Sequence, residues 1–145
     1  MNEWQDRFAQ KLETVRSVTR DWFEVTADAA LTPTYKEFSD FTNRHHVRAT
    51  APLKKTGIRT FKFTMTENTY VLLTFRHTGL QCESQTEVFV PGRKKLPANI
   101  ETTELCEFDN SWCRRMFEHA LDLLLDTLTG SLGGCADVIA EAVPA

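Results

Sequence analysis

The chain has 145 residues and a formal net charge of -3, and 41% of its residues are hydrophobic and 26% charged. This length corresponds to one ordinary domain and this composition to a soluble globular protein, which excludes a disordered chain, a fibrous rod and two separate cores. No segment approaches the roughly 18 uninterrupted apolar residues of a spanning helix, and the N-terminus has no secretory signal, so we expect a cytoplasmic protein without a membrane partner.

The N-terminal segment, residues 3–29, has the periodicity of one long amphipathic helix. Its apolar side chains fall on one arc of about 140° when residues are spaced at 100°. They are Trp4, Phe8, Leu12, Val15, Val18, Trp22 and Val25. Asn2 is suited to cap the start, and the sequence Leu31-Thr32-Pro33 predicts the end, because the residue before a proline avoids helical angles. We expect this arc to face the domain core.

The next part of the chain predicts a short helix followed by strands. Tyr35, Phe38 and Phe41 predict one or two helical turns that close one end of the core. After residue 45 apolar residues alternate with period two, which predicts four strands joined as an antiparallel meander. Their expected ranges are residues 45–54, 58–65, 69–77 and 80–90. The inner face is predicted to carry Phe61, Phe63, Leu73 and Phe75, with Phe61 beside Leu73 and Leu73 beside Ser84.

The C-terminal part of the chain predicts a second helix. A polar connection through residues 97–104 leads to a helix from about Asn110 to Thr129, with Gly130 just past its end. The apolar arc of this helix spans about 220°, which is more than one small sheet covers, so either the first helix or another subunit must cover its flank. The candidate dimer flank is Phe117, Leu121, Leu125 and Leu128. Residues 131–145 are expected to form a flexible or loosely docked tail.

These elements together predict a two-layer α+β domain over residues 1–130, with a long N-terminal helix, a four-stranded antiparallel meander and a C-terminal helix. Both helices are expected on one face of the sheet, with Trp22 and Trp112 over the inner-face phenylalanines. This order of elements is similar to that of small bacterial chaperone-like and peptide-binding α+β domains, a resemblance of architecture that specifies no activity.

The charges are segregated along the chain. Residues 44–95 hold ten Lys/Arg and three Asp/Glu, whereas both flanking segments are acidic. The outer face of the predicted sheet carries the candidate polyanion- or partner-binding residues His46, Arg48, Lys62, Tyr70 and Arg76. Basic groups around an aromatic side chain suit single-stranded nucleic acid. A basic element packed among acidic ones for mutual compensation explains the same pattern.

No residue pattern in the chain indicates catalysis. The four cysteines Cys82, Cys106, Cys113 and Cys135 form no Cys-x-x-Cys pair, so we expect free thiols and no metal or other cofactor. His77 and Cys82 share a face but lack two further metal ligands, and neither a nucleophile elbow nor a phosphate loop occurs. We therefore expect a non-enzymatic interaction module that forms a homodimer or binds another protein or peptide. The alternative is nucleic-acid binding by residues 44–95.

Overall fold

The computed structural model describes residues 2–92 and 96–142, and for residues 131–142 it describes the backbone without the side chains. Helix α1 (Glu3–Thr26) begins at Asn2, whose Oδ1 accepts a hydrogen bond of 2.8 Å from the N–H of Trp4. This is the predicted N-terminal cap, which satisfies one of the N–H groups that a helix start leaves unpaired.

The predicted end of the first helix near Pro33 is wrong. A π-helical turn, η1 (Ala27–Leu31), follows α1 directly and leads into α2 (Thr32–Arg44), so the chain stays helical through the proline. Pro33 lies in the first turn of α2, where a backbone N–H has no partner within its own helix. The short helix predicted over residues 35–41 is therefore the middle of α2.

The sheet has six strands rather than four. They are β1 (Arg48–Ala49), β2 (Leu53–Lys55), β3 (Ile58–Thr66), β4 (Thr69–Thr78), β5 (Gln81–Phe89) and β6 (Asn99–Glu104), all paired antiparallel. The predicted first strand is divided into β1 and β2, which both pair with β3 and lie on either side of Pro52, a residue without an N–H to donate. Strand β6 replaces the predicted polar connection. Five of its six residues are exposed and its one buried residue is Thr103, so the sequence shows little apolar alternation over this strand.

The predicted register is correct between β3 and β4 and shifted between β4 and β5. Phe61 lies opposite Leu73 as expected, whereas Leu73 lies opposite Thr86 instead of Ser84. The shift arises because the hairpin loop consists of residues 79 and 80, with Gly79 at φ +61°. Since strand side chains alternate with period two, a shift of two residues leaves each side chain on its predicted face.

Helix α3 (Asn110–Ala142) follows a 3₁₀ turn, η2 (Leu105–Glu107), and begins where Asp109 Oδ1 accepts a 2.9 Å hydrogen bond from the N–H of Trp112. The predicted end at Gly130 is wrong. Among the described glycines only Gly57, Gly79 and Gly92 have positive φ, so Gly130 does not adopt the left-handed conformation that ends many helices. The expected mobility of residues 131–145 stays a prediction, and residues 143–145 lie outside the described residues.

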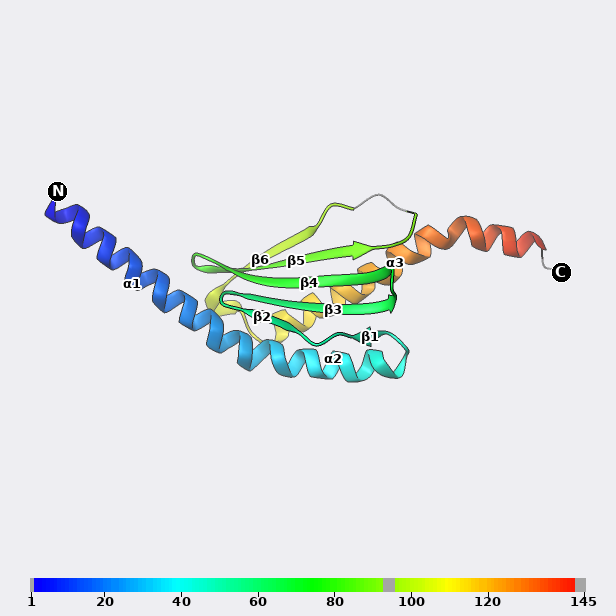
Figure 1. Cartoon of the computed structure of the whole chain (residues 1–145), viewed down its shortest axis with the longest axis horizontal. Helices are drawn as coiled ribbons and strands as arrows, with labels where there is room; N and C mark the ends of the chain where they lie inside the picture. The colour runs from blue at the N-terminus through cyan, green and yellow to red at the C-terminus, as the bar shows by residue number, and fades with distance from the viewer. Residues whose placement is uncertain (1, 93–95, 143–145) are drawn as a thin grey trace.

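Figure 1 shows the arrangement of these elements, in which α3 runs behind the sheet and α2 lies along its β1 edge, while α1 projects away from the body toward the N-terminus. The predicted α+β class, with a long N-terminal helix, an antiparallel sheet and a C-terminal helix, is confirmed. The Phe117 ring of α3 contacts the rings of Phe61 and Phe75 at centroid distances of 5.1 and 5.9 Å. The Tyr35 ring of α2 also contacts Phe61, at 5.1 Å, so both helices pack on the inner face.

Of the two tryptophans that were expected over the inner face, one lies there and the other does not. Trp112 is buried, with its ring 5.8 Å from that of Phe75, as predicted. Trp22 is 46% exposed, and its neighbour Phe23 fills the core instead, at 0%. The reason is the rotation of α1, which turns Thr19, Phe23 and the following Ala27 toward the body.

The inner-face assignment predicts unequal effects for two neighbouring substitutions in β3. Phe63 is fully buried, so Phe63→Ala is expected to cost about 3–5 kcal/mol of unfolding free energy through lost burial and a residual cavity. Lys62 faces the other side, with its Nζ over the Tyr70 ring, and Lys62→Ala should cost about 1 kcal/mol or less. Urea denaturation of both variants measures the difference. A larger loss for Lys62→Ala would mean that the two sheet faces are inverted.

Candidate interaction surfaces

A buried arginine connects α1 to the sheet. Arg59 is 4% exposed and lies on the inner face of β3, opposite Phe75. Its Nη2 pairs with the carboxylates of Glu24 in α1 and Asp28 in η1, and the guanidinium lies 5.8 Å from the centroid of the Phe23 ring. A buried cation is costly unless it is paired and fully hydrogen-bonded. We refer to Arg59, Glu24, Asp28 and Lys54 as the Arg59 cluster.

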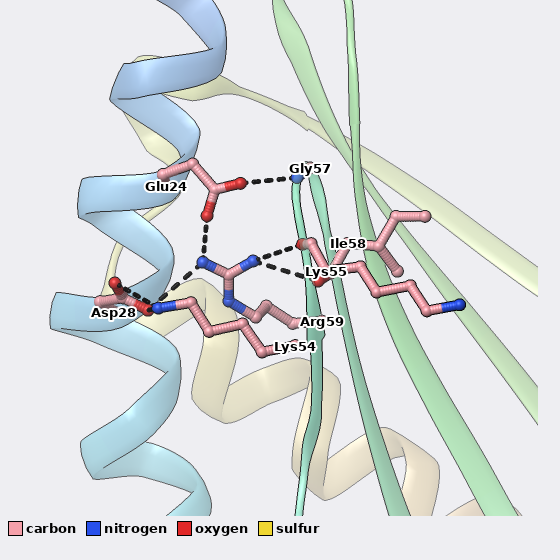
Figure 2. Close-up of polar contacts among 7 residues, drawn as sticks. All are labelled: Glu24, Asp28, Lys54, Lys55, Gly57, Ile58 and Arg59. Atoms are coloured by element: carbon pink, nitrogen blue, oxygen red, sulfur yellow. Dashed lines mark hydrogen bonds and ion pairs between the residues drawn. The ribbon is translucent and has the colours of Figure 1, made fainter.

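The remaining contacts of this cluster lie within the β2–β3 hairpin and between the hairpin and the helical segments α1 and η1 (Figure 2). Nη1 of Arg59 donates to the carbonyl oxygens of Lys55 and Ile58 at 2.9 and 3.0 Å. Glu24 Oε1 accepts a 2.6 Å hydrogen bond from the N–H of Gly57 in the hairpin loop. The Lys54 Nζ lies 3.0 Å from the Asp28 carboxylate. The carboxylates of α1 and η1 are thus held by a hairpin that is far away in the sequence.

The two carboxylates are ionised because their hydrogen bonds outweigh the effect of burial. Desolvation raises the pKa of Glu24. The hydrogen bonds from Arg59 and Gly57 together lower it by more than desolvation raises it, so the pKa lies below its ordinary value. The hydrogen bond from Lys54 is the main cause that lowers the pKa of Asp28, and Arg59 contributes as well. At neutral pH the two carboxylates of the Arg59 cluster are therefore charged and balance the positive charges of Arg59 and Lys54.

The Arg59 cluster determines which side of α1 faces the body. Because Glu24 and Asp28 lie one turn apart, their contacts with Arg59 orient the same side of the helix toward the hairpin. Phe23 and Ala27 are consequently buried, and Trp22, 100° around the helix from Phe23, faces away from the core.

The predicted apolar arc of α1 is exposed to solvent. We refer to it as the α1 stripe, and it consists of Trp4, Phe8, Leu12, Val15, Val18, Trp22 and Val25. Apart from the half-buried Leu12, these side chains are between 46% exposed (Trp22) and 69% exposed (Val25). The Trp4 and Phe8 rings stack on each other at 5.4 Å, one turn apart. The expectation that this arc faces the core is wrong, because the part of α1 that contacts the body does so through a different side.

The predicted dimer flank of α3 is partly covered by α2. Phe117 is fully buried and stacks on Phe38 of α2 at 5.5 Å, so it offers no surface to a partner. Leu121 is half-buried, Leu128 likewise, and Leu125 is 49% exposed. Helix α2, which continues from α1 and η1, thus covers much of the flank.

A groove of about 680 Å³ remains between α2 and α3. Leu121 and Leu125 line it together with Phe41 and Met65, which are both exposed. The carboxylates of Glu118 and Asp122 belong to the same lining. Among the described side chains, this groove and the α1 stripe each bring several large exposed apolar residues together.

The outer face of the sheet divides into a basic and an acidic part. Arg48, Lys62, Tyr70 and Arg76 occupy β1, β3 and β4, and His46 precedes β1 in a turn at φ 63°. The Lys62 Nζ lies 4.3 Å from the centroid of the Tyr70 ring, and Arg76 forms an ion pair of 3.6 Å with Glu83 of β5.

Strand β5 adds Glu87 opposite Leu72 on this same face. A polyanion lying across the face would meet cations on one half and carboxylates on the other, which weakens its attraction. Residues 93–95, which contribute three further basic side chains to the segment, lie outside the described residues.

The groups considered for chemistry have ordinary structural positions. Burial raises the pKa of Cys82 and raises that of Cys113 to about 12, so neither thiol supplies a thiolate at neutral pH. Cys106 is exposed, and the side chain of Cys135 lies outside those described. The ring Nε2 of His77 hydrogen-bonds with the carbonyl of Gly79 at 2.6 Å. Within residues 2–92 and 96–130, whose side chains are described, no group of three or more His, Cys, Asp or Glu could hold a metal ion.

No protein-family model, curated protein or solved structure matches the chain. None of the helices in the described part of the chain has both the length and the apolar character needed to cross a membrane. The functional argument therefore starts from the two exposed apolar surfaces.

The Arg59 cluster predicts a specific pH dependence of stability. The lowered pKa values of Glu24 and Asp28 mean that their stabilising effect is present above the pKa of the unfolded carboxyl groups, about 4, and is lost as the pH falls through the folded values. Glu24→Gln should therefore have a lower unfolding free energy than the wild type at pH 7. Near pH 2 the unfolding free energies of the two proteins should be equal.

Denaturant titrations over this pH range measure that effect. The exposed Glu13→Gln in the same helix is the matched control and should change stability little at any pH. A deficit of Glu24→Gln that stays constant down to pH 2 would mean that ionisation of Glu24 does not stabilise the fold.

Proposed function

We propose that the protein is a non-enzymatic interaction module that assembles as a homodimer through the α1 stripe. The observation that carries this proposal is the row of large apolar side chains on a helix that projects from the body (Figure 1). A single helix in water is only marginally stable, and most helices in proteins owe their stability to packing of an apolar face. The N-terminal turns of α1 lack such packing within the described chain, and a second copy supplies it.

The exposed apolar area is of the size that a protein interface needs. The three aromatic side chains of the stripe are about half exposed and offer on the order of 300 Å². The valines and Leu12 bring the total to roughly 500 Å² per chain. A stable interface buries about 800 Å² per partner, of which somewhat more than half is apolar. The stripe of each chain supplies the apolar part of this area, and the polar residues beside it supply the rest.

The charges on α1 favour a protein partner over a lipid surface. Between residues 3 and 28 the chain has four Lys/Arg and six Asp/Glu. Amphipathic helices that lie on membranes have polar faces rich in Lys and Arg, which anionic lipids attract. The polar side of α1 has the opposite balance, so the stripe is better suited to a second protein surface.

Two variants, one double and one single, distinguish α1 from the α3 flank as the dimer interface. The double variant Phe8→Glu, Val15→Glu places charges in the stripe but touches no core residue, and we expect it to be monomeric, whereas the wild type is dimeric at micromolar concentration. Leu125→Glu, on the exposed part of the predicted flank, is the matched control and should remain dimeric. Sedimentation equilibrium measures the mass, and circular dichroism verifies the fold of each variant.

A wild-type protein that is monomeric at several hundred micromolar would overturn the homodimer. A dimer that Leu125→Glu dissociates and that Phe8→Glu, Val15→Glu leaves intact would move the interface to α3 and contradict the proposed use of α1.

A further inference from the structure

The α1 stripe has the spacing of a coiled-coil seam. Phe8, Val15 and Trp22 recur every seven residues, and Trp4, Val18 and Val25 belong to a second row displaced by three or four. Helices whose apolar residues repeat in this way pair by inserting the side chains of one seam between those of the other. The only polar residue in these rows is Lys11, which occupies the second-row position between Trp4 and Val18.

We propose that two copies of α1 pair antiparallel, with Trp4 of one copy opposite Trp22 of the other. This inference rests on the homodimer proposed above and specifies its geometry. In this register Phe8 lies opposite Val18, and Lys11 lies opposite Val15 of the second copy. Every apolar position of the two rows from Trp4 to Trp22 then has a partner across the seam.

The position of Lys11 favours this direction over the parallel one. A parallel pair places identical residues opposite each other, so two Lys11 ammonium groups would meet at the seam. Like charges at such positions repel each other, and the repulsion is strongest where water is displaced. The antiparallel pair separates the two lysines and lets each extend past a small valine toward solvent.

The charges beside the seam also match the antiparallel pair. Arg7 and Asp21 occupy the same heptad position two repeats apart, next to the first row. In the proposed register, Arg7 of each copy lies opposite Asp21 of the other, which makes two symmetric ion pairs. Both residues are exposed, and within the described part of the chain neither forms an ion pair. In a parallel pair Arg7 would lie opposite Leu12, and no charged pair would form.

A register shifted by one heptad is less favourable because it would place Arg7 opposite Asp28. The Asp28 carboxylate already binds Lys54 and Arg59. The shifted register would also bring Lys11 opposite Trp22. The antiparallel direction fits the shape of the molecule as well, since the body is attached at the C-terminal end of α1 (Figure 1). The two bodies then lie at opposite ends of a helix pair about 36 Å long, at 1.5 Å per residue.

A charge exchange tests the register. Arg7→Asp and Asp21→Arg each replace two ion pairs by two repulsive contacts, and each should weaken the dimer by roughly tenfold at low salt. The double variant Arg7→Asp, Asp21→Arg restores both pairs in the antiparallel dimer and should recover most of the wild-type dissociation constant. Sedimentation at 50 mM and 500 mM salt measures the constants, and the differences should shrink at the higher salt.

A cross-linking experiment tests the direction independently. In a background with Cys106→Ser and Cys135→Ser, Thr14→Cys lies near the twofold axis of the antiparallel pair and should form an intermolecular disulfide on mild oxidation. Val18→Cys should not, because the two copies of residue 18 are separated by about 15 Å along the axis. Efficient cross-linking through residue 18, or a double charge variant as weak as the single ones, would overturn the antiparallel pairing while leaving a homodimer. A monomeric wild type would overturn the homodimer itself.

Discussion

The need to pair one buried guanidinium constrains the arrangement of the N-terminal half of the molecule. Arg59 lies on the inner face of β3 at 4% exposure, where an unpaired charge would cost several kcal/mol. Glu24 and Asp28 supply the compensating charges from α1 and η1. Meeting this requirement orients α1, and the orientation leaves the α1 stripe outside the core. The exposure of the proposed interaction surface is therefore a consequence of how the charge of Arg59 is compensated.

The same contacts account for part of the segregation of charge along the sequence. Arg59 and Lys54 of the basic segment pair with carboxylates of the acidic N-terminal segment, whereas Arg76 of β4 pairs with Glu83 of β5 inside the basic segment. Between the acidic ends, Arg114 of α3 binds the Glu37 carboxylate of α2 with two hydrogen bonds of 2.8 and 2.7 Å. Mutual compensation thus involves several of the basic residues that the sequence leaves available for a polyanion.

The central strands β3, β4 and β5 could be predicted from the sequence because strand alternation is a local signal. The inner-face phenylalanines and the β3–β4 register follow from period two and from short loops. The exposure of the α1 stripe could not be predicted in the same way. Helical periodicity identifies an apolar face, but the burial of Thr19 and Phe23 in its place depends on Arg59, which is more than 30 residues away along the chain. Strand alternation places Arg59 on the inner face together with Phe61 and Phe63, but it does not identify the carboxylates of Glu24 and Asp28 as the partners of Arg59.

Amide hydrogen exchange in α1 tests the central claim, namely that the stripe is covered by a second copy, most directly. The N-terminal turns, residues 3–18, contact little of their own body, so their amides are protected only when the helix is paired. The account predicts protection of residues 3–18 that increases with protein concentration, while the amides of β3 and β4 exchange at a concentration-independent rate. Exchange in residues 3–18 that is fast at every concentration, or slow even at nanomolar concentration, would contradict it.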